Sequence, residues 1–143
     1  MLPEMKIISI IIPCIFFTCR MPGEVDYNNG LFLGTYKSVT LIYPGQADRG
    51  VDLIQHGAYL HIELKKKRQF REDVFIPESP EVAILTSGNE HNEGIYTIRE
   101  DSVLFEGFSQ LRLPRGFQWV ETKSQLIYEW KGRGRHKIVL QKE

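Results

Sequence analysis

Histidine is the side chain best suited to acid–base chemistry near neutral pH. The chain carries four, at His56, His61, His91 and His136. A serine hydrolase of the α/β type would add a Gly-x-Ser-x-Gly turn that exposes its nucleophile, and the sequence contains no such run, no phosphate-binding loop and no dinucleotide fingerprint. His61 and His136 fall among polar neighbours in expected strands, so we expect both to face solvent. The chain is therefore not expected to be an enzyme, and no cofactor is implied.

Two groups of carboxylates could carry chemistry of their own. Glu63, Glu72 and Glu129 could pair as acid and base in a barrel, but strand carboxylates normally face water and we expect these to do so. Glu90-His91-Asn92-Glu93 gathers oxygen and nitrogen ligands in an expected loop. Zinc sites usually combine two His or Cys ligands at a fixed spacing, so no metal site is predicted there.

Aromatic residues are numerous, at 11% of the chain. Most should build the core, because each buries a large apolar area. Others should line a ligand pocket, with Phe117-Gln118-Trp119, beside Pro114-Arg115-Gly116, at its rim. The predicted ligand-binding residues are Tyr96, Phe105, Phe117, Trp119, Tyr128 and Trp130.

The composition indicates a small globular protein with no nucleic-acid partner. The 143 residues suffice for one domain, and 42% hydrophobic with 25% charged residues argues against disorder. The formal net charge is zero, so the overall charge does not attract nucleic acid or an anionic membrane. The basic run Lys65-Lys66-Lys67-Arg68 is followed closely by Glu72-Asp73, which favours an exposed turn.

The first residues are typical of an export signal. Lys6 precedes an apolar run over 7–17, which is too short for a membrane-spanning helix but suits the core of a signal peptide. Phe16-Phe17-Thr18-Cys19 resembles a bacterial lipobox, in which the cysteine accepts the lipid. We therefore expect a leader over 1–19, lipidation of Cys19 and a tether over 20–30. Simple cleavage with secretion, or a retained anchor, are the alternatives.

Both cysteines, Cys14 and Cys19, lie within that leader. The remaining domain, 31–143, thus has no internal disulfide and no thiolate nucleophile. Cysteine ligation of a metal in its core is excluded for the same reason.

From Leu31 onward, apolar and polar residues tend to alternate, which is the pattern of half-buried strands. Leu60, Ile62 and Leu64, for example, should share one face of a strand. Strands are predicted near 31–43, 51–55, 58–66, 69–76, 81–86, 94–99, 102–106, 109–113, 117–121, 125–131 and 135–141, some of which must merge or be loops. The expected fold is all-β, a single antiparallel up-and-down barrel of about eight to ten strands, because closure removes exposed sheet edges.

The domain resembles the lipocalin-like small barrels of bacterial lipoproteins in three places. Gly34-Thr35-Tyr36 is similar to the family's Gly-x-Trp in the first strand, with Tyr in place of Trp. The segment 94–105 is similar to its hairpin of glycine, tyrosine and isoleucine followed by a turn and an apolar strand. The segments 125–130 and 135–140 are similar to its closing pair of strands.

This resemblance implies a barrel that holds one small hydrophobic ligand, in a lipid-anchored protein of the bacterial cell envelope. It also implies that Tyr36 packs under a basic side chain of the last strand, here Arg135, with Lys137 as the second choice. A barrel filled by its own side chains is the alternative. It would present loops to a protein partner as an interaction or inhibitor module, and the location would be periplasmic or secreted if Cys19 is not lipidated.

Overall fold

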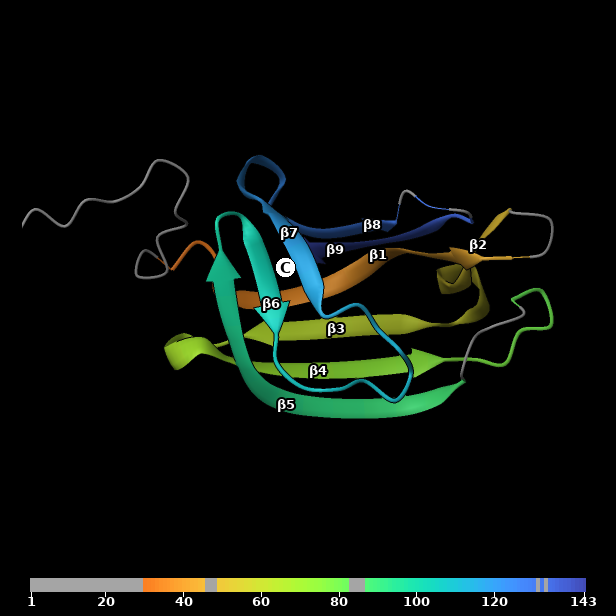
Figure 1. The fold of residues 1–143 in the computed structure, drawn as a ribbon, viewed down its shortest axis with the longest axis horizontal. Helices are drawn as coiled ribbons and strands as arrows, with labels where there is room; N and C mark the ends of the chain where they lie inside the picture. The colour runs from red at the N-terminus through yellow and green to blue at the C-terminus, as the bar shows by residue number, and fades with distance from the viewer. Residues whose placement is uncertain (1–29, 46–48, 83–86, 131, 133) are drawn as a thin grey trace, which may run out of the picture.

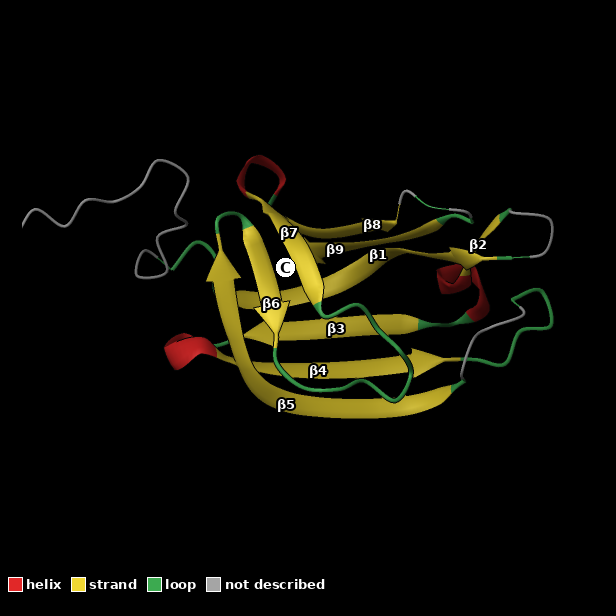
Figure 2. Cartoon of the chain, in the orientation of Figure 1, coloured by secondary structure: helices red, strands yellow, loops and turns green. Residues whose placement is uncertain are grey.

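The computed structural model describes residues 30–45, 49–82, 87–130, 132 and 134–143. The predicted leader and nearly all of the tether, including Cys14 and Cys19, lie outside these residues. Within them the strands are β1 (Gly34–Pro44), β2 (Gly50–Asp52), β3 (Tyr59–Leu64), β4 (Gln69–Ile76), β5 (Gly88–Arg99), β6 (Ser102–Phe105), β7 (Gly116–Val120), β8 (Gln125–Trp130) and β9 (His136–Lys142). Short 3-10 turns follow β2 (η2, Leu53–His56), β3 (η3, Lys66–Arg68) and β7 (η4, Glu121–Lys123) (Figure 2).

Eight of these strands form a closed antiparallel barrel, as the alternating pattern predicts. β1 pairs with β3, each strand from β3 to β8 pairs with the next one along the chain, and β9 pairs with β1 to complete the ring (Figure 1). β2 is an addition to the edge of β1, alongside its last residues. In the described part of the chain no helix has the length and hydrophobicity needed to span a membrane.

Alternation along the strands sorts the side chains into the barrel interior and the outer surface. Leu60, Ile62 and Leu64 of β3 are buried, as predicted, and their cross-strand neighbours on β4 include Phe70 and Val74. Burying a side chain of this size contributes roughly 1.5 to 3 kcal/mol. The barrel is therefore held together chiefly by its apolar interior.

Aromatic rings fill the end of the barrel at which β1 begins. The rings of Phe32 and Trp119 meet edge to face at 5.5 Å, and Tyr36 meets Trp119 in the same way at 5.8 Å. Tyr96 completes the group 5.8 Å from Phe32. The Tyr36 hydroxyl donates a hydrogen bond of 2.6 Å to the Phe32 carbonyl, which ties the chain before β1 across this end.

The predicted contact between Tyr36 and Arg135 is wrong, because antiparallel pairing brings the start of β1 to the end of β9. Tyr36 is opposite Lys142, whereas Arg135 precedes β9 and lies beside Gly50 at the other end of the barrel. Lys137, the second choice, is opposite Ile42. The basic residue at the seam is Lys142: a Cβ on Gly34, whose φ is +142°, would lie 2.9 Å from its Cε. Glycine therefore lets Lys142 cross there and donate to the Leu31 carbonyl, 2.6 Å away.

Four of the predicted local assignments also need correction. The segment predicted as a strand over 51–55 is a strand only to Asp52, and Leu53–His56 form the turn η2. The segment 109–113 is a loop and not a strand, and Val82 and its predecessor Glu81 are outside any strand; 83–86 lie beyond the described residues. The run from Glu90 to Glu93, expected in a loop, belongs to β5, because β4 supplies its hydrogen-bond partners along the whole of that run. The tight turn at Glu100-Asp101 and the exposed turn at Lys66–Arg68 are confirmed.

Candidate functional site

The loop between β6 and β7, residues 106–115 (the β6–β7 loop), covers a gap in the barrel wall. On β5, the pairing with β6 is limited to residues 96–99, so no strand of the described residues pairs with the first part of β5 on that side. The loop runs along it instead, and its Glu106 N–H donates to the Ile95 carbonyl at 2.9 Å. Leu111 and Leu113 of the loop are buried against the interior. Figure 1 shows the loop crossing in front of β3 and β4 toward β5.

Glu90 of β5 fastens the middle of this loop. Its carboxylate accepts hydrogen bonds from Ser109 Oγ at 2.9 Å, from the Gln110 N–H at 2.7 Å and from the Leu111 N–H at 3.0 Å. Burial opposes ionisation of Glu90, but the bonds from Leu111, Asn92, Gln110 and Ser109 lower its pKa below the ordinary value. The loop is thus held by an ionised carboxylate on the adjacent strand.

Arg115, the last loop residue, enters the barrel and pairs with a buried carboxylate. Its Nη1 lies 3.1 Å and 3.2 Å from the two oxygens of Glu72, whose side chain is fully buried. Asn92 Nδ2 donates a third hydrogen bond to Glu72, at 3.0 Å. The prediction that Glu72 faces water is therefore wrong. A buried carboxylate is tolerated here because a cation and an amide satisfy it.

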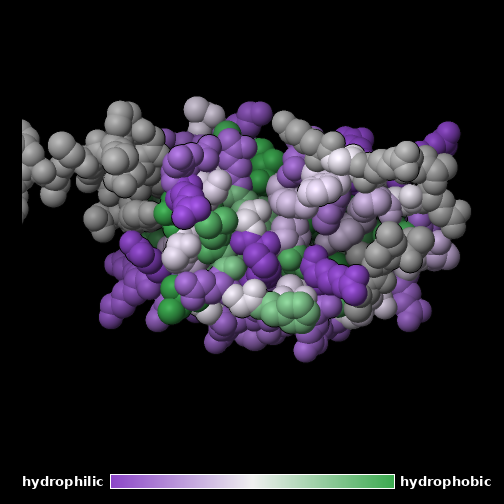
Figure 3. Space-filling view, viewed as in Figure 1, coloured by the Kyte–Doolittle hydropathy of each residue, from purple (hydrophilic) through white to green (hydrophobic). Residues whose placement is uncertain are grey.

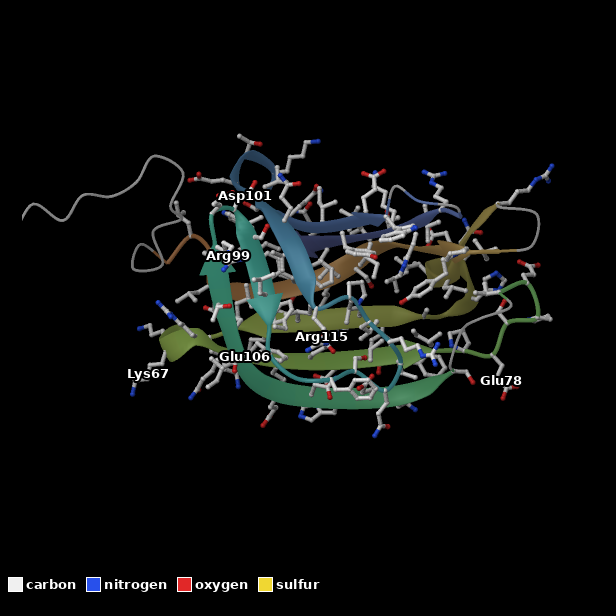
Figure 4. The ribbon with its side chains drawn as sticks, viewed as in Figure 1. Lys67, Glu78, Arg99, Asp101, Glu106 and Arg115 are labelled. Atoms are coloured by element: carbon white, nitrogen blue, oxygen red, sulfur yellow. The ribbon has the colours of Figure 1, made fainter. Side chains whose placement is uncertain are left out.

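The guanidinium of Arg115 also lies over two aromatic rings that contact each other. Its Cζ lies 5.7 Å from the centroid of Phe70 and 5.6 Å from that of Phe105, within cation–π range. Figure 4 shows Arg115 where the β6–β7 loop joins β7, in front of β3 and β4. The ion pair therefore sits inside an aromatic surrounding and joins the loop to β4.

A second cluster of polar side chains lies where β1 and β9 meet. Ile42 is opposite Lys137, which places Tyr43 and His136 next to each other, with ring centroids 4.3 Å apart. The Tyr128 ring of β8 meets His136 edge to face at 5.0 Å. His136 was expected to face solvent, and this expectation is wrong, because the residue shares the inward side of β9 with Ile138 and Leu140.

Burial sets the protonation of these three rings. Burial lowers the pKa of His136, so its imidazole is neutral near pH 7. Burial, and then the negative charge of Glu72 and the neighbouring Tyr128, raise the pKa of Tyr43, and burial raises that of Tyr128. All three rings are therefore uncharged at neutral pH, and Tyr43 lies close enough to Glu72 to sense its charge.

Among the residues that the structure describes, three buried polar atoms of this interior have no hydrogen-bond partner. They are Tyr43 Oη, Arg115 Nε and His136 Nε2. Buried polar atoms in native proteins nearly always have a partner, and each exception requires an explanation. Leaving such an atom unpaired costs about 1–3 kcal/mol. These atoms are therefore places where a water molecule or a ligand atom would bind favourably.

A hollow of about 410 Å³ opens in the barrel wall beside this group. The β7–β8 ladder runs from Val120 opposite Gln125 to Gln118 opposite Ile127. The next two residues in register, Phe117 and Tyr128, both line the hollow and are not among those ladder pairs. On the side of the molecule formed by β6, β7 and their loop, the surface shows small apolar areas between hydrophilic ones (Figure 3). Tyr128, which lines the hollow, also contacts His136.

A second hollow, of about 350 Å³, lies on the outside of β4 and β5. Its lining includes Lys65, Gln69 and Ile95. The ladder between β4 and β5 is intact here, with Gln69 opposite Ile95. This hollow is therefore closed off from the barrel interior, and it is the weaker candidate.

The six predicted ligand-binding aromatics separate into three groups. Phe117 and Tyr128 line the wall hollow. Tyr96, Phe105 and Trp119 are buried and pack on other rings of the core. Trp130 is 56% exposed at the end of β8, opposite His136 in the β8–β9 register. The predicted rim at 114–119 contributes Gly116, Phe117 and Gln118 to the hollow.

Four residues of the interior site were not among the predicted ligand-binding residues: Tyr43, Glu72, Arg115 and His136. Two of them carry a signal in the alternating pattern. Glu72 shares the side of β4 occupied by Phe70, Val74 and Ile76, and His136 shares the side of Ile138. Arg115 has no such signal, because it belongs to a loop.

The Glu90–Glu93 run contributes two kinds of contact from opposite sides of β5. Glu90 and Asn92 reach the loop and Glu72, whereas His91 and Glu93 are on the outer surface. His91 Nδ1 lies 2.6 Å from Asp73 Oδ1, and its Nε2 lies 3.3 Å from Glu93 Oε1. Among the residues that the structure describes, no group of three or more His, Cys, Asp or Glu side chains is arranged to hold a metal ion.

Comparison with known proteins gives no match from which a function could be transferred, so the function is argued from the geometry of the barrel. The chain matches no family model, no curated protein sequence and no solved structure.

Proposed function

We propose that this chain is an exported, lipocalin-like binding protein whose barrel takes up one small, mainly apolar molecule without catalysis. The observation that carries the proposal is a hollow of about 410 Å³ in the barrel wall, where the β7–β8 ladder ends before Phe117 and Tyr128. Apolar pockets with a few convergent polar groups are the usual form of small-molecule sites. The unpaired atoms of Tyr43 and His136 are such groups.

The filled end of the barrel supports entry at the hollow. Phe32, Tyr36 and Trp119 occupy the end at which β1 begins and contact one another. A ligand there would have to displace packed rings. Beside β7 and β8 it would instead meet an existing opening, so the hollow is the proposed entrance.

Binding can be tested with N-phenyl-1-naphthylamine, whose fluorescence rises in apolar surroundings. We expect the full chain to bind it, and Ile127→Trp, which places a large ring in the hollow, to weaken binding about tenfold or more. Val39→Trp is the matched control, because Val39 is exposed on β1. Equal loss in both variants, or no binding by the wild-type protein, would contradict the proposal. Native mass spectrometry of protein purified from its own host would show a retained ligand directly.

The proposal includes a lipid anchor on Cys19, which would place the barrel on a membrane of the bacterial cell envelope. Its support is the lipobox-like run Phe16-Phe17-Thr18-Cys19 after an apolar leader. Radiolabelled palmitate should enter the protein, and Cys19→Ser should abolish labelling, with Cys14→Ser as the control. Labelling that persists in Cys19→Ser would contradict lipidation of Cys19, and no labelling at all would favour simple secretion.

One feature favours a second function, in which the barrel presents the β6–β7 loop to a protein partner. Phe108 is 80% exposed on that loop, although exposing a phenylalanine ring to water is unfavourable. In that case Phe108→Ser should weaken binding of the partner protein, and Ile127→Trp should not. The opposite result would favour the small-molecule function.

A further inference from the structure

The unpaired atoms of the interior belong to one connected group. Tyr43 stacks on His136, and His136 meets Tyr128. Tyr128 in turn meets Phe117 with ring centroids 6.3 Å apart, and both of these line the wall hollow. A molecule that displaces the Tyr128 ring from the hollow would therefore reach His136 Nε2 and Tyr43 Oη next.

The charged side chains of this interior already have partners. Glu72 and Arg115 neutralise each other through two close contacts, and Glu90 is engaged by three donors of the β6–β7 loop. The Tyr43 and His136 rings are neutral. An added ion would have no counter-ion of its own among these groups, and burying an unpaired charge is far more costly than burying a hydroxyl.

We propose that the site selects an uncharged molecule that joins an apolar body to one hydrogen-bonding oxygen, held by Tyr43 Oη and His136 Nε2. This inference rests on the proposed function, and it specifies the class of ligand. A hydroxyl suits the pair best, because it can donate one hydrogen bond and accept another. It can therefore satisfy His136 in either tautomer, with Tyr43 as the second partner. The Arg115 Nε–H is a further donor for the same oxygen or for a water beside it.

The test compares four probes that share one ring system and differ in a single group. Naphthalene has no polar group, 2-naphthol adds a neutral hydroxyl, 2-naphthoate adds a negative charge and 2-naphthylmethylamine adds a positive one. Their affinities are measured near pH 7 by displacement of N-phenyl-1-naphthylamine. We expect 2-naphthol to bind about tenfold more tightly than naphthalene, as one well-formed buried hydrogen bond allows. Both ions should bind more weakly than 2-naphthol.

Tyr43→Phe removes only the hydroxyl of this ring and therefore tests its contribution to binding. The variant should retain the affinity for naphthalene and lose most of the preference for 2-naphthol. Its free energy of unfolding without ligand should be unchanged or higher, since removing a buried, unpaired hydroxyl takes away a desolvation cost. Tyr59→Phe, which removes a hydroxyl from the exposed side of β3, is the matched control and should change neither quantity. His136→Phe should also reduce the preference for 2-naphthol.

The outcomes separate this inference from the proposed function. Equal binding of naphthalene and 2-naphthol, or tighter binding of either ion, overturns the inference and leaves a small-molecule barrel in place. A preference for 2-naphthol that survives in Tyr43→Phe overturns the assigned contact. Failure of all four probes and of N-phenyl-1-naphthylamine to bind overturns the proposed function, and the inference with it.

Discussion

Arg115 and Glu72 form an ion pair inside the barrel although 43 positions separate them in the chain. One nitrogen, Nη1, lies within 3.2 Å of both carboxylate oxygens. The carboxylate belongs to β4 and the guanidinium to the end of the β6–β7 loop. The pair therefore fixes where this loop rejoins the barrel, at the start of β7 and beside the wall hollow.

Arg115→Met should destabilise the protein by about 3 kcal/mol, because it leaves the Glu72 carboxylate buried without its cation. This value is at the lower end of the range for removing one partner of a buried ion pair, since the Arg115 side chain is 22% exposed. Urea denaturation measures the change. The double variant Glu72→Met with Arg115→Met should recover most of the loss, as apolar residues often replace buried ion pairs without cost. A loss no larger than that of Arg99→Met, at an exposed position on β5, would contradict the assigned role.

Glu90→Gln should loosen the middle of the β6–β7 loop. The amide that replaces the carboxylate cannot accept all three of its hydrogen bonds, and bonds to a charged acceptor are worth about 1.5–3 kcal/mol. Amide hydrogen exchange at Gln110 and Leu111 should accelerate about tenfold or more. Glu93→Gln, on the outer side of the same strand, should leave exchange unchanged. Similar protection in both variants would show that Glu90 does not hold the loop.

The same carboxylate predicts a dependence of the loop on pH. The pKa of Glu90 is lower in the folded protein than its ordinary value of 4.5. Its contribution to stability is therefore complete above that ordinary value and is lost as the pH falls through the lower, folded-state pKa. Exchange at Gln110 should rise over that acidic range in the wild-type protein, and Glu90→Gln should remove this rise.

Tyr36→Phe should lower the free energy of unfolding by about 1–2 kcal/mol, because the buried Phe32 carbonyl loses its 2.6 Å donor. Thermal or urea denaturation measures the loss. Tyr59→Phe should change stability by less than about 0.5 kcal/mol, as is usual for an exposed position. If the two substitutions cost the same, the Tyr36 hydroxyl does not secure the closed end of the barrel.

His91 should titrate above its ordinary value of 6.5. The hydrogen bond that His91 donates to Asp73 is the main cause of the raised pKa; partial desolvation opposes it and Glu93 adds to it. Because the folded pKa is raised, the stabilising contribution is complete below the ordinary value and disappears as pH rises through the folded pKa. An NMR titration of the imidazole tests this, and Asp73→Asn should bring the pKa down. An unchanged pKa in that variant would argue against the contact.

Most of the strands and much of the core could be predicted from local pattern alone. Alternation at Leu60, Ile62 and Leu64 identifies both a strand and its buried face, because successive side chains of a strand point to opposite sides. The turn at Glu100 and Asp101 is likewise local, since it lies directly between two strand patterns. Closure into a barrel also follows, because it removes the unpaired edges that a long antiparallel meander would expose.

The site depended on contacts between segments that are distant in the sequence. Alternation alone puts Glu72 on the inner side of β4, yet an unpaired carboxylate there would be too costly. The structure resolves this conflict by bringing Arg115 to it from a loop. For His136, burial is tolerated because its pKa is lowered and the ring is neutral. Neither partner is visible in the local sequence around these residues.

Register at the seam was also decided only by the tertiary structure. Tyr36 is opposite Lys142, not Arg135, because β1 and β9 run antiparallel along almost their whole length. The pairing of β5 with β4 was likewise decided by the tertiary structure. The local sequence around Glu90 and Asn92 is polar and predicts a loop, but pairing with β4 makes both residues part of a strand. Residue types thus indicate which segments can be strands, whereas the hydrogen-bond partners across the barrel determine where each strand begins and which polar side chains meet inside it.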